Sequence, residues 1–492
     1  METLVKWYEW GKEAFEKAEI EGKPVLLTLT ATWCHWCHVH DKENYSDKEV
    51  AGFINNHFIP IRVDIDQRPD IKERYNLGGF PTISFLNWYG ESLGGGTYQP
   101  KDQFMNSLHA FLTLYKTNIG EKKFNAKNFS KRISAKNESQ KRCLIELDKK
   151  VVNHEAGFIL SAFDQVNGGF GTSPKFPMTD AIDFCFDMYS VNVDAKFMNI
   201  IKKTLDGMKY LMDEVEGGFF RYSTSKDWSE PHCEKMLETN AGLLSNYARG
   251  FKATENPTYK KVITKIFSYV NNNLLEEGKA FYGSQDADEA YYNTSMAGRK
   301  RLTAPAIDKT FYVDWNAKMI SAYLEASEIM KDEVPKQLAL NAIHFIMKNC
   351  YDKQKGMFHM HRLTKENPGN LADNAYMIKA LLDARKATSI AKYLDAADRL
   401  MSIALKSFSG KTFGFFDRIA YSDDIGSLNI DAKPLAENAV MAMNLIKLSK
   451  LLGKEEYKEL ARKTLLSVSC DYEEYGIHGA VFGKAVKMYL EA

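Results

Sequence analysis

A glycine followed within three residues by an aromatic residue recurs along the last two thirds of the chain. Six copies occur, 49 to 78 residues apart, at Gly168, Gly217, Gly278, Gly356, Gly414 and Gly479. A second element, Asn-Ala opening a helical pattern, occurs at Asn240, Asn316, Asn374 and Asn438. Self-similarity of this kind predicts a repeat architecture, because one supersecondary unit cannot bury its apolar faces alone.

Two helical patterns lie between successive glycine elements, for example 371–387 with 391–406, and 435–452 with 456–470. Each unit is therefore expected to be a helical hairpin. Six hairpins in series favour a closed ring of inner and outer helices, an (α/α)6 toroid, over an open stack. The glycines are expected to permit tight loops, and the asparagines to cap inner helices or join neighbouring repeats.

The first hundred residues follow a different pattern. An apolar, β-branched run at 23–32 predicts a buried strand that leads directly into "WCHWCHVH". A helical pattern, a second strand at 59–66, a short helix and a third strand starting at "GGFPT" follow. A turn starting at "GGGTYQP" and a closing helix come next. A Cys-x-x-Cys motif beside a βαβ pattern indicates the thioredoxin fold.

This fold gives individual residues roles. Cys34, at the start of a helix, would be the attacking cysteine, because the positive helix end stabilises its thiolate, and Cys37 the resolving one. Pro81 stands where the fold places a cis-proline opposite the cysteines. His35 and Trp36, between the two cysteines, would modulate the redox behaviour of the pair.

Three alternatives remain for this motif. The spacing from Cys34 to His38 is also that of c-type haem attachment, which the buried strand before it disfavours. Zinc held by Cys34, Cys37 and His38 or His40 is chemically reasonable, since thiolates and imidazoles suit it. The cysteines could also be part of a thioredoxin-like fold that has no redox task.

Charge and composition exclude several classes of function. The 65 Lys and Arg residues nearly balance the 64 Asp and Glu residues, so no general field attracts nucleic acid. No apolar run reaches the length of a membrane helix, and the charged N-terminal stretch is unlike a secretory signal. We therefore expect a cytoplasmic protein that uses no cofactor and binds neither membrane nor nucleic acid.

The segment 116–142 carries nine basic residues against two acids and is rich in Asn and Ser. This composition is typical of a solvated linker. The sequence thus predicts a thioredoxin-like domain at 1–117, a basic linker at 118–142 and the toroid at 143–492.

Polar and aromatic residues gather in two inter-helix segments of the toroid. Proton transfer is expected of His232, Glu234 and Asp286, because epimerisation needs a base next to a carbonyl and glycosidic hydrolysis needs two carboxylates. Substrate binding is expected of Arg221, Tyr222, Asp227, Trp228, Gln285, Asp288 and Trp315. Asp286 and Asp288 could instead form turns or a weak calcium site.

The motifs "KPVLLTLTATWCHWCHVH", "GGFPTISFLN", "NGGFGTSPKFP" and "SQDAD" together resemble the thioredoxin-domain-containing proteins of the spermatogenesis-associated protein 20 type, the DUF255 family. The resemblance covers nearly all of the chain. It implies a thioredoxin-like domain fused to a toroid similar to sugar epimerases and glycosidases. Two departures are a short segment at 289–313, where the family has a longer one, and His40, where an apolar residue is usual.

The function expected from these observations is thiol-disulfide exchange with a protein dithiol or disulfide partner, combined with a carbohydrate ligand in the toroid. One alternative is a sugar epimerase or glycoside hydrolase with an accessory first domain. Another is a non-catalytic binding or scaffold protein.

Overall fold

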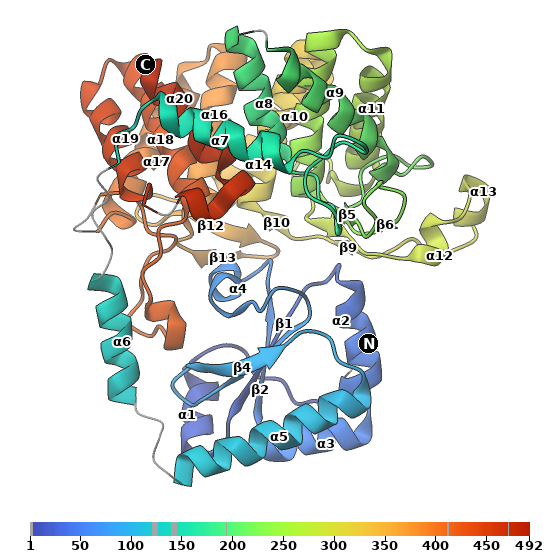
Figure 1. The fold of residues 1–492 in the computed structure, drawn as a ribbon, viewed down its shortest axis with the longest axis vertical. Helices are drawn as coiled ribbons and strands as arrows, with labels where there is room; N and C mark the ends of the chain where they lie inside the picture. The colour runs from blue at the N-terminus through green and yellow to red at the C-terminus, as the bar shows by residue number, and fades with distance from the viewer. Residues whose placement is uncertain (1–2, 121–125, 139–144, 193, 411–412, 471) are drawn as a thin grey trace. The chain divides into compact units, whose positions relative to one another are not determined.

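The computed structural model describes the chain except for residues 1–2, 121–125, 139–144, 193, 411–412 and 471 (Figure 1). Two compact units are present. The first comprises Met1–Gln140 and Ala420–Ala432, and the second comprises Lys141–Ile419 and Lys433–Ala492. The boundaries predicted from sequence stay a prediction, and they differ from these units in the assignment of 420–432. A helix, α6 (Ala126–Glu138), lies inside the segment expected to be a linker.

The first unit contains a four-stranded sheet of order β2-β1-β3-β4. Its strands are β1 (Val25–Thr30), β2 (Ile59–Asp64), β3 (Thr82–Leu86) and β4 (Ser92–Gly96). β1 is parallel to β2 and antiparallel to β3, and every residue of β1 is buried. A strand buried on both faces explains the near-continuous apolar run in the sequence.

The described residues of this unit form six α-helices. Besides α6, they are α1 (Lys12–Glu21), α2 (His35–His40), α3 (Lys48–His57), α4 (Pro69–Tyr75) and α5 (Lys101–Gly120). The element order confirms the thioredoxin-like fold. The sequence expectation was wrong for Gly94–Gly96, which lie in the edge strand β4 rather than in a turn.

Residues 420–432 complete the first unit through contacts with α4 and the loop after β3. The Tyr75 hydroxyl accepts a hydrogen bond from the Ser427 amide at 2.8 Å and donates one to the Gly90 carbonyl at 2.7 Å. Arg74 donates to the carbonyls of Ser427 and Ile430. Gly426 has a φ of 61°, and a Cβ there would lie 2.4 Å from the Tyr75 hydroxyl. Only glycine therefore fits this close approach.

The second unit is a ring of six inner helices, each in contact with the next (Figure 1). They are α8 (Thr179–Asn192), α10 (Leu237–Thr254), α14 (Val313–Met330), α16 (Leu371–Thr388), α18 (Leu435–Leu452) and α20 (Ala480–Leu490). α20 contacts α8 and so closes the ring. The closed (α/α)6 toroid is confirmed, and the open stack is excluded.

An outer helix packs against each inner one. The outer helices are α7 (Lys149–Ala162), α9 (Ala195–Met208), α11 (Pro257–Tyr269), α15 (Glu333–Asn349), α17 (Ala391–Ser407) and α19 (Glu455–Ser467). The hairpins expected at 371–406 and 435–470 are present as α16 with α17 and α18 with α19, with bounds that differ by at most three residues.

Short strands and helices fill the loops of this unit. The strands are β5 (Tyr222–Ser223), β6 (Pro231–His232), β7 (Lys235–Met236), β8 (Ser284–Gln285), β9 (Ile307–Asp308), β10 (Phe311–Tyr312), β11 (Tyr351–Asp352), β12 (Gly356–His361) and β13 (Lys365–Pro368). The helices α12 (Glu289–Tyr292) and α13 (Met296–Arg299) lie in the segment that is short relative to the resembled family.

The repeated asparagines form hydrogen bonds with the backbone of the loops that follow the repeated glycines. Asn316, near the start of α14, accepts a hydrogen bond from the Phe281 amide at 2.9 Å and donates one to the Phe281 carbonyl at 2.9 Å. Asn240 and Asn438 hold the backbones of Phe219 and Phe415 in the same way. Asn374 accepts from the Met357 amide. Each asparagine thus fixes the loop that follows a repeat glycine, and five of those six glycines have φ between 71° and 86°.

One buried carboxylic acid in this ring, Glu155, has no hydrogen-bond partner for its side chain among the described residues. Glu155 of α7 is wholly buried, and neither of its carboxylate oxygens has a hydrogen-bond partner among the described residues. A Cβ at Gly479 would lie 2.5 Å from its Oε1, so this glycine makes room for the side chain. Burial raises the pKa of Glu155 to about 8. The group is therefore protonated in the folded protein at neutral pH.

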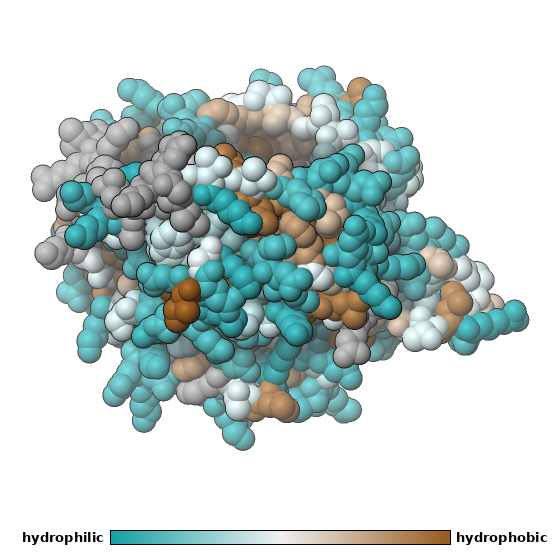
Figure 2. All heavy atoms as spheres, turned by 90° about the horizontal axis from the view of Figure 1, so that it is seen from below, coloured by the Kyte–Doolittle hydropathy of each residue, from teal (hydrophilic) through white to brown (hydrophobic). Residues whose placement is uncertain are grey.

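Every helix in the described part of the chain is too short or too polar to cross a lipid bilayer. On the face shown in Figure 2, hydrophobic side chains are scattered among hydrophilic ones.

Candidate functional site

The two cysteines of the first unit form a disulfide, with their Cα atoms 5.2 Å apart. Cys34 is the residue that caps α2, and its sulfur accepts a hydrogen bond from the Cys37 amide at 3.2 Å. Buried β1 ends just before this turn, so the sheet fixes the start of the helix. An amide that points at the Cys34 sulfur, together with the helix end, favours a negative charge there when the pair is reduced.

Three residues were expected to modulate this pair: His35 and Trp36, which lie between the two cysteines in the chain, and Pro81. The peptide bond between Phe80 and Pro81 is cis, as expected from the fold. The rings of His35 and Trp36 meet edge to face, 5.7 Å apart, and Trp36 is 45% exposed. Trp33 anchors the turn through a hydrogen bond from its indole nitrogen to Asp66 at 2.5 Å. The effects of His35, Trp36 and Pro81 on the redox potential stay predictions.

The zinc alternative also stays a prediction. Disulfide formation between Cys34 and Cys37 leaves no thiolate at either residue to bind a metal. His40 is wholly buried, and its Nδ1 accepts a hydrogen bond from the Asn44 amide group at 3.0 Å. Burial and the nearby Arg62 lower the pKa of His40 to about 3, so its imidazole is neutral.

A cavity of about 640 Å³ lies inside the toroid and is lined by residues from all six inner helices. Its wall carries both acids and bases. Lys318 pairs with Glu238 at 2.9 Å, Arg249 pairs with Glu325 at 2.7 Å, and Lys379 pairs with Asp383 at 2.9 Å. A cavity of this volume suits a small ligand, and such a wall offers hydrogen-bond donors and acceptors to one rich in oxygen.

Among the predicted residues of the toroid, the structure brings His232, Glu234 and Tyr222 together. The His232 Nδ1 lies 2.6 Å from the Glu234 carboxylate, and the Tyr222 and His232 rings stack at 4.9 Å. Tyr222 also stacks on Phe176, and the Arg221 guanidinium lies 5.5 Å from its ring. The described cavity wall does not include His232 or Glu234. Their catalytic roles stay predictions.

The other polar candidates have local structural partners. Asp288 caps α12 by accepting from the Tyr291 amide at 2.9 Å, and Asp286 accepts from the Ala287 amide at 2.7 Å. Gln285 is buried and donates to the Pro305 carbonyl. In the exposed loop, Asp227 accepts from Ser225 and Ser229, each at 2.7 Å. These hydrogen bonds fit the turn-forming role that the sequence left open for Asp286 and Asp288.

Two tryptophans expected to bind substrate are buried. Trp228 has no exposed surface, and its indole nitrogen donates to the Asn167 carbonyl at 3.2 Å. Its ring also covers Gly169, where a Cβ would lie 2.4 Å away. Trp228 therefore packs a loop and presents no face to a ligand, which corrects the expectation. Trp315 is 7% exposed and lies 4.8 Å from the Tyr312 ring.

A buried charge network anchors the short segment that contains α12 and α13. Arg299 is 3% exposed and makes two hydrogen bonds to Asp213, at 2.7 and 3.0 Å. Lys235 donates to the same carboxylate at 2.7 Å, and Glu216 accepts from Arg299 at 2.9 Å. Because its charges are mutually paired, this network fits an architectural role better than a catalytic one.

Sequence reasoning missed a further cluster formed by Asp314, His359 and Asp373. One potential ligand atom from each residue lies within 4.8 Å of those of the other two. A signal was present, because an acid precedes every repeated asparagine by one or two positions: Glu238, Asp314, Asp373 and Glu437. His359 carries no such periodic signal, because a histidine at this position after the repeat glycine occurs in one repeat only.

The geometry defines a fusion of a thioredoxin-like domain and an (α/α)6 toroid. Residues 1–138 match the family model described as "Protein of unknown function, DUF255". The first unit thus matches the DUF255 model, and the chain is similar to spermatogenesis-associated protein 20, as the resemblance of the sequence motifs indicated. It is 24% identical to spermatogenesis-associated protein 20 of Rattus norvegicus, over 92% of this chain and 74% of that protein.

Two further relatives match parts of the chain. An uncharacterized protein of Caenorhabditis elegans is 33% identical over 58% of this chain, and the match spans only 41% of that protein. The disulfide bond reductase DsbH of Chlamydia pneumoniae is 25% identical over 20% of this chain and 64% of its own length.

Comparison with solved structures supports the architecture of the second unit. A sugar epimerase from a ruminal bacterium superposes with a TM-score of 0.56 at 13% identity, over 70% of this chain and 97% of that one. At this identity the likeness concerns the fold alone.

Proposed function

We propose that the first unit exchanges disulfides with a protein partner through Cys34 and Cys37. The observation that supports this most is the hydrogen bond from the Cys37 amide to the Cys34 sulfur at the start of α2. This contact stabilises Cys34 as the thiolate, which is the nucleophile in exchange. The similarity to a disulfide bond reductase favours reduction of the partner.

The steps follow from the two positions. The Cys34 thiolate attacks one sulfur of the partner's disulfide, and the other partner sulfur leaves as a thiolate. Cys37, deprotonated, then attacks the Cys34 sulfur of the mixed disulfide. The partner leaves with two thiols, and the Cys34–Cys37 disulfide carries the oxidation until an external dithiol reduces it. A cytoplasmic location, where such dithiols are maintained, stays a prediction.

An equilibrium redox titration tests this proposal. The full-length protein is equilibrated in glutathione or dithiothreitol buffers, its thiols are alkylated, and the peptides with Cys34 and Cys37 are measured by mass spectrometry. We expect one reversible two-electron transition that involves both residues. If the pair stays open in oxidising buffers, or closed in strongly reducing ones, disulfide exchange is not its function.

For the second unit we propose binding of an oxygen-rich ligand, such as a carbohydrate, in the 640 Å³ cavity. The supporting observation is a wall of paired acids and bases from six helices. Tyr376 adds an aromatic ring to this wall, and Lys318 lies 4.6 Å from that ring. The fold shared with sugar epimerases makes carbohydrates the first class to test.

Thermal unfolding with a panel of mono- and disaccharides tests the cavity. We expect one class of sugar to raise the melting temperature in proportion to the logarithm of its concentration above the dissociation constant. Replacing Lys379 with alanine should weaken that effect, whereas replacing half-buried Lys458, which lies outside the described cavity wall, should not. A panel with no effect at millimolar concentrations would count against a carbohydrate ligand.

A further inference from the structure

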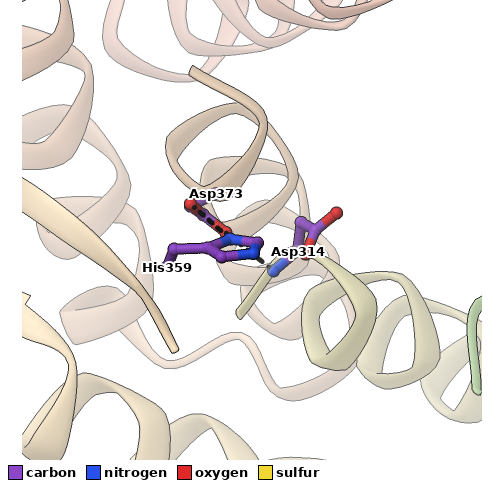
Figure 3. Close-up of side chains that lie close together, drawn as sticks. All are labelled: Asp314, His359 and Asp373. Carbon is purple, nitrogen blue, oxygen red and sulfur yellow. Dashed lines mark hydrogen bonds and ion pairs between the residues drawn. The ribbon is translucent and has the colours of Figure 1, made fainter. Parts of the chain in front are cut away.

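Three side chains from two neighbouring repeats of the toroid meet in one buried cluster (Figure 3). Asp314 is the second residue of α14, and Asp373 is the third residue of α16. His359 lies on β12, the strand before α16. One nitrogen or oxygen from each residue lies within 4.8 Å of those of the other two, which is close enough for a single small ion to contact all three.

Two of these side chains already hold one another. The His359 Nδ1 lies 3.0 and 3.1 Å from the two carboxylate oxygens of Asp373, and the Asp314 amide donates to Asp373 at 3.2 Å. Asp373 is wholly buried, and His359 is 4% exposed. The hydrogen bonds fix the orientation of the imidazole and of one carboxylate before any ion arrives.

Asp314 is the residue whose bonding is incomplete. It is 9% exposed, and its Oδ1 accepts no hydrogen bond from any residue that the structure describes. The nearest base on the same helix, Lys318, is already paired with Glu238 at 2.9 Å. Among the described residues, no ion pair joins Asp314 to a basic side chain.

We propose that Asp314, His359 and Asp373 bind one divalent transition-metal cation. Two carboxylates and one imidazole are donors that suit Zn²⁺ and Mn²⁺. A cation would offset the negative charge of both buried carboxylates. Three protein ligands leave at least one coordination position for water or another oxygen ligand, as in catalytic rather than structural zinc sites.

The position of the cluster would bring such an ion close to the molecule proposed to bind in the toroid cavity. Lys318 lies one helical turn after Asp314, and Tyr376 lies one turn after Asp373, and both line the 640 Å³ cavity. An ion held here would lie at the edge of that cavity, where a hydroxyl or carbonyl oxygen could coordinate it. The metal proposal does not depend on disulfide exchange or on the identity of the sugar.

Metal titration of the full-length protein tests the proposal. Chelator-treated protein, with the Cys34–Cys37 disulfide kept closed so that the cysteines cannot bind zinc, is titrated with Zn²⁺ and with Mn²⁺ by calorimetry. We expect one ion per chain and a rise in melting temperature. Asp314→Asn and His359→Gln should weaken binding by at least about tenfold.

Glu437→Gln provides a matched control, because Glu437 is the third residue of an inner helix, as Asp373 is, but lies outside the cluster and outside the described cavity wall. This variant should bind the ion as the unmodified protein does. Anomalous scattering from metal-soaked crystals locates the ion even if a cluster variant fails to fold. Absence of binding, binding that Asp314→Asn leaves unchanged, or an ion found elsewhere would each overturn the proposal.

Discussion

Replacing Cys37 with serine is expected to convert the protein from a turnover catalyst into a trap for its disulfide partners. Cys34 keeps its position at the start of α2 and still attacks, but no second thiolate releases the mixed disulfide. Reduction of a model disulfide substrate should fall to the uncatalysed rate, while adducts through Cys34 accumulate. Non-reducing electrophoresis and peptide mass spectrometry measure both effects.

Two control variants show which cysteine attacks and which one resolves the mixed disulfide. Cys34→Ser should lose activity without forming adducts, because the attacking sulfur is gone. Cys233→Ser should remain fully active, since Cys233 is a buried free cysteine of the toroid whose pKa burial raises to about 12. If adducts form through Cys37 in the Cys34→Ser protein, the two roles are reversed. If the Cys37→Ser protein turns over normally, the proposed mechanism is wrong.

Replacing Glu155 with glutamine is expected to remove a large pH dependence of the free energy of unfolding. This carboxyl ionises near its ordinary pKa of 4.5 in the unfolded chain and near 8 in the folded protein. Its contribution to stability is therefore fully present below pH 4.5 and is lost as the pH rises toward 8. Between these values, the unmodified protein should lose up to about 1.4 kcal/mol per pH unit through this group.

Denaturant unfolding at several pH values measures the slope, which does not depend on the constant cost of burying the glutamine amide. The Glu155→Gln protein should show a flatter profile from pH 5 to 8. Glu456→Gln, at an exposed position of α19, should keep the profile of the unmodified protein. Equal slopes for all three proteins would show that Glu155 ionises in the folded state at an ordinary pKa.

The fold of each unit could be predicted from the sequence where a local pattern of residues repeats or alternates. The apolar run of β1 followed by Cys34 and Cys37 is sufficient for the thioredoxin-like unit, because these residues are neighbours in the chain. Six glycine elements sufficed for the ring, since each hairpin must bury its faces against the next. β4 was missed because its glycines lack the β-branched side chains that mark a strand.

The candidate sites were harder to foresee because ring closure decides which loops meet. Trp228 looked like a ligand-stacking residue in a polar loop, but Asn167 and Lys175 of an earlier loop cover its ring. Asp314, His359 and Asp373 are separated by up to 59 residues and become neighbours only when α14, β12 and α16 pack together. No local pattern carries that information.

The asparagine contacts of the toroid have a consequence for how this scaffold can diversify. Asn240, Asn316 and Asn438 hold the preceding loops through backbone amides and carbonyls and make no demand on the loop side chains. The side chains of a loop can therefore change, or the loop can lengthen beyond the residue that the asparagine binds, while that residue stays hydrogen-bonded to the inner helix. In such a ring the backbone framework can stay the same while the loop side chains change, so related chains can share one fold and recognise different molecules.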